Sequence, residues 1–425
     1  MTTDVPAPVA RDPMFLEAAA RLADRLCRDA VWDADQCNWL GWAMTPVGHT
    51  WALAYRAQPP NLYDGTSGIA LFLARVYAQT ADPVVRATAL GAITCSQRRA
   101  DALAGPLRSA FYSGQLGMAY ACAEVGRAVG AEPVLARGVK MLDDLREVGP
   151  ADGGLDICSG SAGAIQALLH LAREVERPGL VDLAVRHGDH LLATARKTDD
   201  GWSWETMPGA HRDLLGYAHG TAGIAAGLLE LWAATREARF RDAALAAVRY
   251  ERRHFDKGSG NWPDYRTVDT TKAPPAPAFT LAWCHGAPGV GLSRTRAHAL
   301  LPEDPTFAEE VQAALQTTVT HFAATWATGP GNFSLCHGAG GNAELFIAAA
   351  EVFARPDLLA IAQTVGRNGI ARHHANPRPW PCGVADGRET PNLMLGLAGV
   401  GYFYLRLYDP QAVPSVLLLT TPSHN

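Results

Sequence analysis

The sequence predicts an all-α fold, an α/α toroid of seven outer and seven inner helices. Two observations predict it: a Gly-x-x-Gly motif occurs seven times in the 425 residues, and amphipathic helical segments separate the copies. One such motif carries no information, but a motif that returns along a chain indicates a repeat architecture. We find no sustained alternation of apolar and polar residues with hairpin turns, so the signals for strands are weak throughout the chain.

The glycine motifs define the frame of the repeat. Their first glycines lie 46 to 66 residues apart, and small or apolar helix-forming residues follow each pair, which predicts an inner helix after every motif. Glycine suits the turn that enters such a helix, because it allows unusual φ angles and close approach of backbones. The first glycines are Gly65, Gly114, Gly160, Gly220, Gly286, Gly338 and Gly396.

The segments between the motifs predict the outer helices. Each has apolar residues at helical spacing and a charged face, as expected of helices that line the outside of a ring. The predicted outer helices are 13–32, 83–103, 134–148, 180–197, 237–255, 307–324 and 357–374. We expect a single domain over residues 1–425, with residues 1–12 as a flexible N-terminus.

The composition limits the classes of function. With 48% hydrophobic residues the chain can bury a large core, and a net charge of -5 gives no basic surface for nucleic acid or anionic membranes. The first residues lack the pattern of a secretory signal, and no apolar run is long enough to span a membrane. We therefore expect a soluble, cytoplasmic protein, whose eight cysteines are free thiols or metal ligands.

Residues just before the glycine pairs are the candidates for a site. If all inner helices run in one direction, the seven turns meet at one mouth of the ring, and their side chains face one pocket. The residues two before the first glycine are Tyr63, Tyr112, Cys158, Ala218, Cys284, Cys336 and Met394. The residues one before it are Asp64, Ser113, Ser159, His219, His285, His337 and Leu395.

A metal site is one interpretation of this frame. Cys284 and Cys336 hold the same offset in consecutive repeats, so their sulfurs can approach, and two thiolates with one imidazole leave a fourth position open, as in catalytic zinc sites. We prefer His337 to His285 as the third ligand, although the frame does not separate them. The alternative is that both cysteines are small buried hydrophobic residues, which is a common fate of free cysteine. Cys158 shares the offset, but we interpret it as a core residue.

Acid–base chemistry is suggested at the same mouth. Asp156 lies four residues before Gly160, and His219 directly precedes Gly220. A histidine in a helix-entry turn is often only hydrogen-bonded, but its place beside a possible metal favours catalysis. Asp64 is interpreted as the N-cap of the first inner helix.

Two long loops are expected to border this mouth. They span residues 256–279 and 373–392 and are rich in Gly, Pro and aromatic residues, and loops of that length in a compact domain are usually functional or mobile. The second loop contains His373, His374 and Cys382, which we interpret as solvated loop residues rather than a second metal site.

The motifs "AHGTAG", "WCHGAPG" and "CHGAGG", with the glycine turns from residue 60 to 420, resemble the lanthionine synthetase C-like family. In sequence these motifs are most similar to the C-terminal cyclase domain of bifunctional lanthipeptide synthetases. This chain has no room for the dehydratase region of those enzymes. The resemblance implies a lanthionine synthetase, an enzyme that adds cysteine thiolates to dehydroalanine or dehydrobutyrine to form thioether rings. Its substrate would be a dehydrated precursor peptide with its leader, made by a separate dehydratase or kinase–lyase chain.

The resemblance also implies the roles of the site residues. One zinc ion would be held by Cys284, Cys336 and His337, and the acid–base pair would be Asp156 and His219. Some members carry an arginine four residues before the first zinc cysteine and a tyrosine directly after it. This chain has Thr280 and His285 at those two positions, so those roles do not transfer.

Three other functions are considered. A zinc-binding toroid without cyclase activity, which binds a thiol compound or a partner protein, would share every ligand, and retention of Asp156 and His219 favours catalysis over it. A glycosidase or sugar epimerase of the α/α-barrel type would need paired carboxylates, and the mouth has few acids. A prenyltransferase-like toroid would need basic residues for a diphosphate, which the glycine turns do not show.

Overall fold

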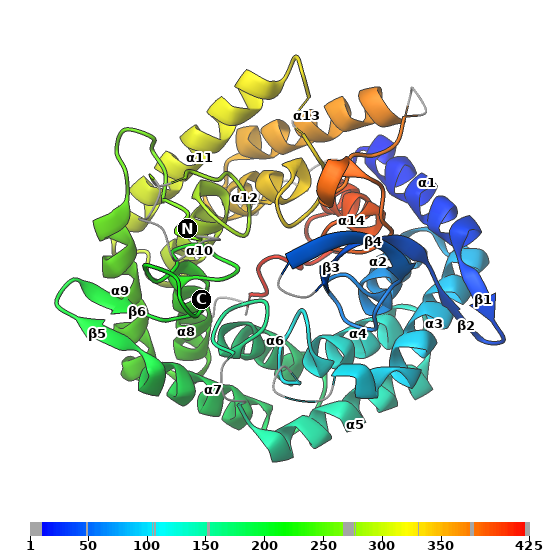
Figure 1. The fold of residues 1–425 in the computed structure, drawn as a ribbon, viewed down its shortest axis with the longest axis horizontal. Coiled ribbons are helices and arrows are strands. Elements are labelled where there is room, and N and C mark those ends of the chain that lie inside the picture. Colours follow the sequence, from blue (N-terminus) through cyan, green and yellow to red (C-terminus); the bar gives the residue numbers. More distant parts are fainter. Residues whose placement is uncertain are drawn as a thin grey trace, which may run out of the picture.

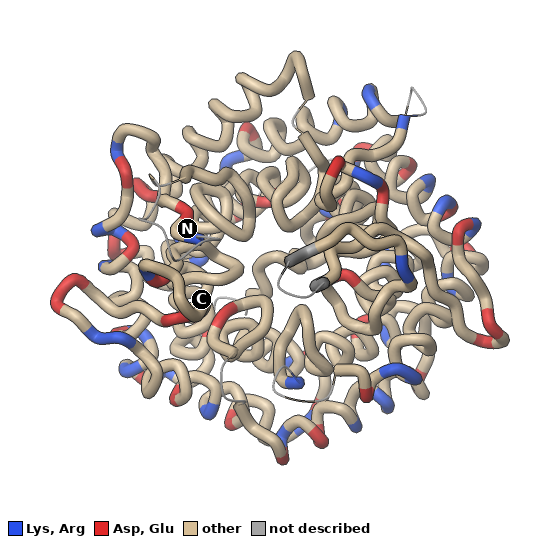
Figure 2. The backbone as a smooth tube through the Cα atoms, in the orientation of Figure 1, with Lys and Arg blue, Asp and Glu red and all other residues tan. Residues whose placement is uncertain are grey.

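The computed structural model describes residues 11–47, 50–103, 105, 108–150, 154–266, 276, 278–329, 331–374 and 378–420. Over these residues it contains fourteen α-helices in two concentric rings (Figure 1). The predicted α/α toroid is therefore confirmed. Figure 2 shows the Lys, Arg, Asp and Glu residues gathered mainly on the outer ring.

The odd-numbered helices form the outer ring, and several begin with an aspartate cap followed by proline. Asp12, Asp82 and Asp304 accept hydrogen bonds from backbone N–H groups of the first turn, which satisfies donors that a helix leaves free. The outer helices are α1 (Pro13–Asp29), α3 (Pro83–Arg98), α5 (Glu132–Val148), α7 (Leu180–Thr194), α9 (Ala238–His254), α11 (Pro305–Thr325) and α13 (Pro356–His373).

The even-numbered helices form the inner ring and begin directly after the first glycine of each motif. They are α2 (Thr66–Thr80), α4 (Gln115–Ala128), α6 (Ser161–Glu174), α8 (Thr221–Thr235), α10 (Ala287–Leu300), α12 (Ala339–Val352) and α14 (Leu397–Tyr408). Close approach explains the second glycine better than φ does. A Cβ on Gly117, for example, would lie 1.8 Å from the carbonyl oxygen of Phe111. Among the first glycines, only Gly286 has a left-handed φ, of 85°.

The ring closes through its first and last helices. Each inner helix packs against the outer helix that follows it, and α14 packs against both α1 and α2. The N-terminal part of the chain thus supplies an outer helix, as predicted. Of the expected flexible N-terminus, residues 1–10 lie outside the described residues, whereas Arg11 pairs with Asp409 and Asp12 caps α1.

Although the strand signals in the sequence are weak, a few strands form. The described residues form three antiparallel hairpins: β1 (Val31–Asp33) with β2 (Gln36–Asn38), β3 (Leu40–Val47) with β4 (Thr50–Ala57), and β5 (Arg196–Thr198) with β6 (Gly201–Ser203). In β3 the alternation is one of size rather than polarity. Gly41 and Ala43 are buried, while Leu40 and Met44 are 52% and 40% exposed. All four residues are apolar or small, so no apolar–polar alternation predicts this strand.

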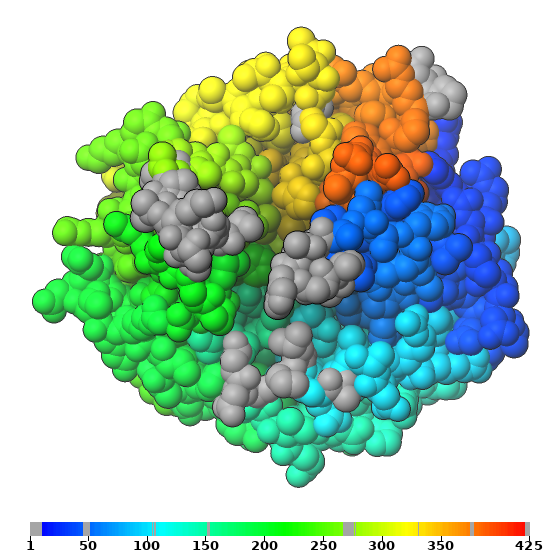
Figure 3. Space-filling view, viewed as in Figure 1, coloured from blue at the N-terminus to red at the C-terminus, as the bar shows by residue number. Residues whose placement is uncertain are grey.

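The end of the chain fills the middle of the ring. Val413, Val416 and Leu417 are buried, and the carbonyl oxygen of Leu417 accepts a hydrogen bond of 3.1 Å from the indole Nε1 of Trp283. Figure 1 shows this last segment, in red, running in toward the centre. Figure 3 shows the same face in space-filling form, hollowed at its centre beside hairpin β3–β4, in blue, and the segment that precedes α14, in orange. None of the described helices is long and apolar enough to cross a membrane.

Candidate metal centre and acid–base pair

A belt of backbone hydrogen bonds joins the seven glycine turns. Except at the third turn, where Ile157 donates in place of Cys158, the residues two before the first glycines bond to one another around the ring, so that side chains with this offset lie next to each other. The bonds run from Met394 N to Tyr63 O (2.9 Å), Tyr63 N to Tyr112 O (3.0 Å), Tyr112 N to Cys158 O (3.2 Å), Ile157 N to Ala218 O (3.1 Å), Ala218 N to Cys284 O (3.2 Å), Cys284 N to Cys336 O (3.2 Å) and Cys336 N to Met394 O (3.0 Å).

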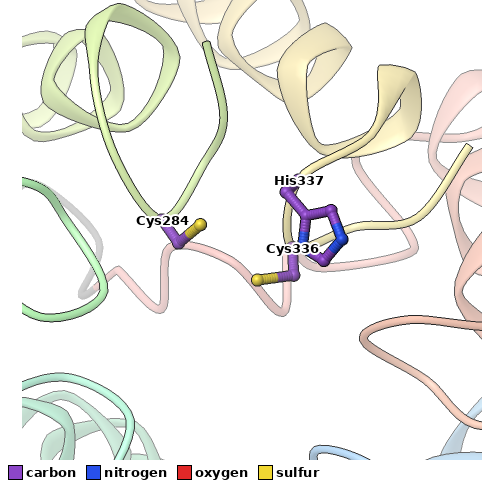
Figure 4. Close-up of side chains that lie close together, drawn as sticks. All are labelled: Cys284, Cys336 and His337. Atoms are coloured by element: carbon purple, nitrogen blue, oxygen red, sulfur yellow. The ribbon is translucent and has the colours of Figure 1, made fainter. Parts of the chain in front are cut away.

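The belt brings a cluster of three metal-binding side chains together. One ligand atom each of Cys284, Cys336 and His337 lies within 4.8 Å of the others, and within the described part of the chain they form the one such group of His, Cys, Asp and Glu. Figure 4 shows the two sulfurs pointing toward each other from the turns that precede α10 and α12. Both cysteines are 5% exposed, whereas His337 is exposed. His285, the other candidate ligand, lies outside the cluster.

The donor set fits zinc. Two thiolates and one imidazole are soft to intermediate ligands that zinc prefers, and three protein ligands leave a fourth position for water or substrate. The two cysteine side chains also interact with each other. A hydrogen bond from the Cys284 thiol lowers the pKa of Cys336, against the effect of burial. The cluster can therefore hold one metal ion with an open coordination position.

A buried carboxylate holds a histidine at the same mouth. The Nδ1–H of His219 donates to Oδ2 of Asp156 at 2.8 Å, while Oδ1 of Asp156 accepts the backbone N–H of Ser159 at 2.6 Å. Burial acts to lower the pKa of His219, but the hydrogen bond and negative charge of Asp156 outweigh it and raise that pKa. The His219 side chain keeps 35% of its surface exposed. The imidazole of His219 therefore stays protonated to a higher pH than an ordinary histidine. Its Nε2 remains available to a ligand.

Next to this pair lies a second network that the sequence reasoning missed. The His219 and His285 rings stack with their centroids 5.8 Å apart, and Nδ1 of His285 lies 3.6 Å from Oδ1 of Asp264. Asp264 pairs with Arg266 at 2.6 Å. Burial, followed by the charge of Arg266, lowers the pKa of His285 to about 3, so this imidazole is neutral. Burial acts to raise the pKa of Asp264, but its hydrogen bond with Arg266 outweighs that effect and lowers the pKa to about 2.

Both long loops reach the site. Asp264 and Arg266 belong to the first, and a Cβ on Gly383 of the second would lie 2.9 Å from Nε2 of His337. Residues 267–275, 277 and 375–377 of these loops lie outside the described residues. The only sequence signal for Arg266 was its position in a loop already expected to border the mouth.

The expectation that Asp64 caps the first inner helix is wrong. The cap residue of α2 is Gly65, which has no side chain to accept a hydrogen bond. Asp64 instead bonds to Asn61, whose Nδ2 donates to Oδ1 of Asp64 at 2.8 Å and whose Oδ1 accepts the Asp64 N–H at 3.0 Å. The carboxylate therefore braces the turn before the helix.

The remaining candidate residues are packed against other parts of the protein. Cys158 is buried, and its carbonyl oxygen takes part in the backbone belt. The expectation that Cys382, His373 and His374 are solvated loop residues is wrong. Cys382 is 1% exposed, His373 ends α13, and both histidine rings pack against Trp380. The loop folds back onto the barrel there because its aromatic residues bury apolar surface.

Comparison with known proteins agrees with this architecture. A family model described as lanthionine synthetase C-like protein matches residues 56–418. Among solved structures, nisin cyclase superposes with a TM-score of 0.64 at 16% identity, covering 96% of this chain and 97% of that chain. An unsaturated glucuronyl hydrolase from Streptococcus agalactiae gives a TM-score of 0.51 at 10% identity, covering 94% of this chain and 92% of that chain.

At these identities the two structures show a shared fold, whereas the family model spans most of the chain, including every glycine turn. Together with the ring of fourteen helices in the described residues, this match establishes the family. The chain belongs to the lanthionine synthetase C-like family.

Proposed function

We propose that the protein is a zinc-dependent lanthipeptide cyclase. It would add cysteine thiolates of a dehydrated precursor peptide to dehydroalanine or dehydrobutyrine, and so form lanthionine or methyllanthionine rings. The observation that carries this proposal is the meeting of an open three-ligand cluster with a hydrogen-bonded carboxylate–histidine pair at one mouth. The similarity to nisin cyclase supports the fold on which it rests.

Cys284, Cys336 and His337 would hold the zinc ion, and Asp156 would position His219. A peptide thiol has an ordinary pKa near 8.5, and zinc in this site supplies the ionised sulfur at neutral pH. Burial of both protein cysteines, each 5% exposed, limits the access of bulk water to their sulfurs. His337 is the exposed member of the cluster.

The reaction needs an acid as well as a nucleophile. When the sulfur bonds to the β-carbon, the electrons of the carbon–carbon double bond move toward the carbonyl group and form an enolate. His219 then donates a proton to the α-carbon, and the proton that left the thiol balances the one delivered. The raised pKa of His219 suits it to this step, because the imidazole is protonated over more of the neutral pH range.

The partners follow from the chemistry. The chain would act on a peptide whose Ser and Thr have already been dehydrated by another catalyst, in the cytoplasm, where such peptides are made. The competing possibility is a member of the family that holds zinc and binds a thiol compound or a protein without catalysis.

Incubation with a dehydrated peptide separates these two possibilities. A leader-bearing peptide with one dehydroalanine and one cysteine is mixed with zinc-loaded protein, with chelator-stripped protein as the control, and free thiols are counted by alkylation and mass. We expect the cysteine to resist alkylation only after treatment with the loaded protein. Full alkylation after prolonged incubation with the loaded protein contradicts the proposal and favours the non-catalytic possibility.

A further inference from the structure

Arg266 is a fixed cation in a loop that lies outside the repeat frame. Its Nε and Nη2 donate to the carboxylate of Asp264 at 3.0 and 2.6 Å, and its backbone N–H donates to Oδ1 at 3.1 Å. Asp264 is itself anchored, since its N–H donates to Ala278 O at 2.8 Å and its Oδ2 accepts the Thr280 hydroxyl at 3.1 Å. The Asp264 side chain is 7% exposed and that of Arg266 38% exposed. The guanidinium is thus held on one side and accessible on the other.

The contacts of Asp264 place Arg266 beside the candidate site. Asp264, which holds the guanidinium, lies 3.6 Å from the His285 ring. That ring stacks on His219, and His285 directly follows Cys284 in the chain. Arg266 therefore lies near the acid–base pair and near the turn that carries the first thiol.

That position matches where negative charge develops. In the addition, the sulfur bonds to the β-carbon beside the thiol cluster, and the α-carbon receives its proton from His219. The carbonyl carbon is attached to the α-carbon, so its oxygen, which takes the electron pair in the enolate, must lie near both groups. A cation fixed in advance at such a point stabilises the charge without reorganisation.

We propose that Arg266 binds the carbonyl oxygen of the dehydro residue and stabilises the enolate that forms on it, with Asp264 and Thr280 as positioning residues. This inference rests on the proposed cyclase function. The atoms balance as before: the guanidinium donates hydrogen bonds to the oxygen and transfers no proton, and the electron pair returns to the α-carbon when His219 protonates it.

The test compares Arg266→Ala and Arg266→Lys with Arg212→Ala. Arg212 is the matched control, because its guanidinium lies over the Tyr265 ring at 5.5 Å in the same region. The probe is the peptide with one dehydroalanine and one cysteine. We expect Arg266→Ala to lower kcat by roughly 10²–10³-fold, the usual effect of removing one donor to a developing oxyanion. Bound zinc and KM should change little, and Arg266→Lys should retain part of the rate.

Chemical rescue separates substrate contact from a structural role. Millimolar guanidinium ion should restore part of the kcat of Arg266→Ala and leave Arg212→Ala unchanged. An Arg266→Ala rate within about threefold of wild type, or a loss that guanidinium does not restore, overturns the inference while the proposed function stands. A zinc-loaded wild-type protein that leaves the peptide uncyclised overturns the proposed function, and this inference with it.

Discussion

The two ends of the inner barrel use the repeat frame in opposite ways. At the mouth, two residues before each first glycine, the frame places the thiols of Cys284 and Cys336 with their sulfurs pointing toward each other. About 15 Å further along each helix, ten residues after the glycine, it places mostly ionisable residues instead. These residues are Arg75, Glu124, His170, Glu230, Arg296 and Arg406, and the sixth repeat has Ala348 at this position.

At the far end the charges pair between neighbouring inner helices. Arg75 of α2 bonds to Glu124 of α4, Arg296 of α10 to Glu230 of α8, and Arg406 of α14 to Glu344 of α12 at 2.8 Å. Several of these residues line a cavity of about 780 Å³. One offset of the repeat thus places candidate metal ligands at the mouth, while another places charged residues that join neighbouring helices.

The strongest test of this division removes both thiols at the mouth. We expect Cys284→Ala with Cys336→Ala to lose bound zinc and to cyclise no faster than the peptide alone. Ionisation alone accounts for about 30-fold at pH 7, since a thiol with a pKa near 8.5 is only about 3% ionised. Metal analysis and alkylation measure the two effects.

Cys158→Ala is the matched control, because Cys158 has the same offset but lies outside the cluster. It should keep both zinc and activity. If the double variant still binds zinc, the two cysteines do not hold the metal, and the metal site does not lie at the mouth.

The next largest effect concerns the acid at the mouth. His219→Asn should lower kcat by roughly 10²–10⁴-fold, the range for loss of a general acid, while the zinc content stays as in the wild type. Single-turnover cyclisation with metal analysis on the same sample is the measurement. Unchanged kcat would show that another group protonates the α-carbon.

A substitution at the far end of the barrel should lower the stability of the fold and leave kcat unchanged. The Arg406 and Glu344 side chains are 6% and 4% exposed, and Arg406→Met leaves Glu344 buried without this partner. We expect a loss of about 3–5 kcal/mol in the free energy of unfolding, with kcat per folded molecule unchanged. Urea unfolding, together with kcat measured below the transition, gives both numbers. A kcat that falls in step with stability would couple the two ends and break the comparison.

Much of the ring and the cluster could be predicted from sequence because both depend on register. Gly286 and Gly338 fix the positions of Cys284 and Cys336, and neighbouring repeats then force the sulfurs together. Most residues of the far-end ion pairs follow the same register, ten residues after the first glycines, whereas Glu344 lies six residues after Gly338. Arg296 and Glu230 were thus predictable in principle.

Other features could not be predicted from the frame. Hairpin β3–β4 alternates small with large residues on an apolar background, so Gly41 and Ala43 gave no polarity signal. Arg266 lies between repeats, and its position depends on Asp264 and on the contact between Asp264 and Ala278. Cys382 is buried because its loop packs back on the barrel through Trp380, a tertiary effect that local composition does not report.

The smallest predicted effect is a shift in pH dependence at the mouth. The negative charge of Asp156 raises the pKa of His219 against burial, so Asp156→Asn should lower that pKa. If the imidazole acts as the proposed acid, the rate falls as pH rises through its pKa, and the alkaline limb of the kcat profile should move to lower pH in the variant. The carboxamide oxygen that Asp156→Asn introduces can still accept the Nδ1–H, so the rate at acidic pH should change less than in His219→Asn.

Stability supplies an independent readout of the same pair. A raised histidine pKa stabilises the fold fully below the ordinary value of about 6.5, and this contribution disappears as pH rises through the raised value. The difference in unfolding free energy between wild type and Asp156→Asn should therefore shrink across that interval. Two results together would contradict this prediction: an alkaline limb that stays in place, and a difference in unfolding free energy that does not shrink as pH rises. They would mean that Asp156 does not set the pKa of His219. The protonating group would then have to be sought among the other residues of the mouth.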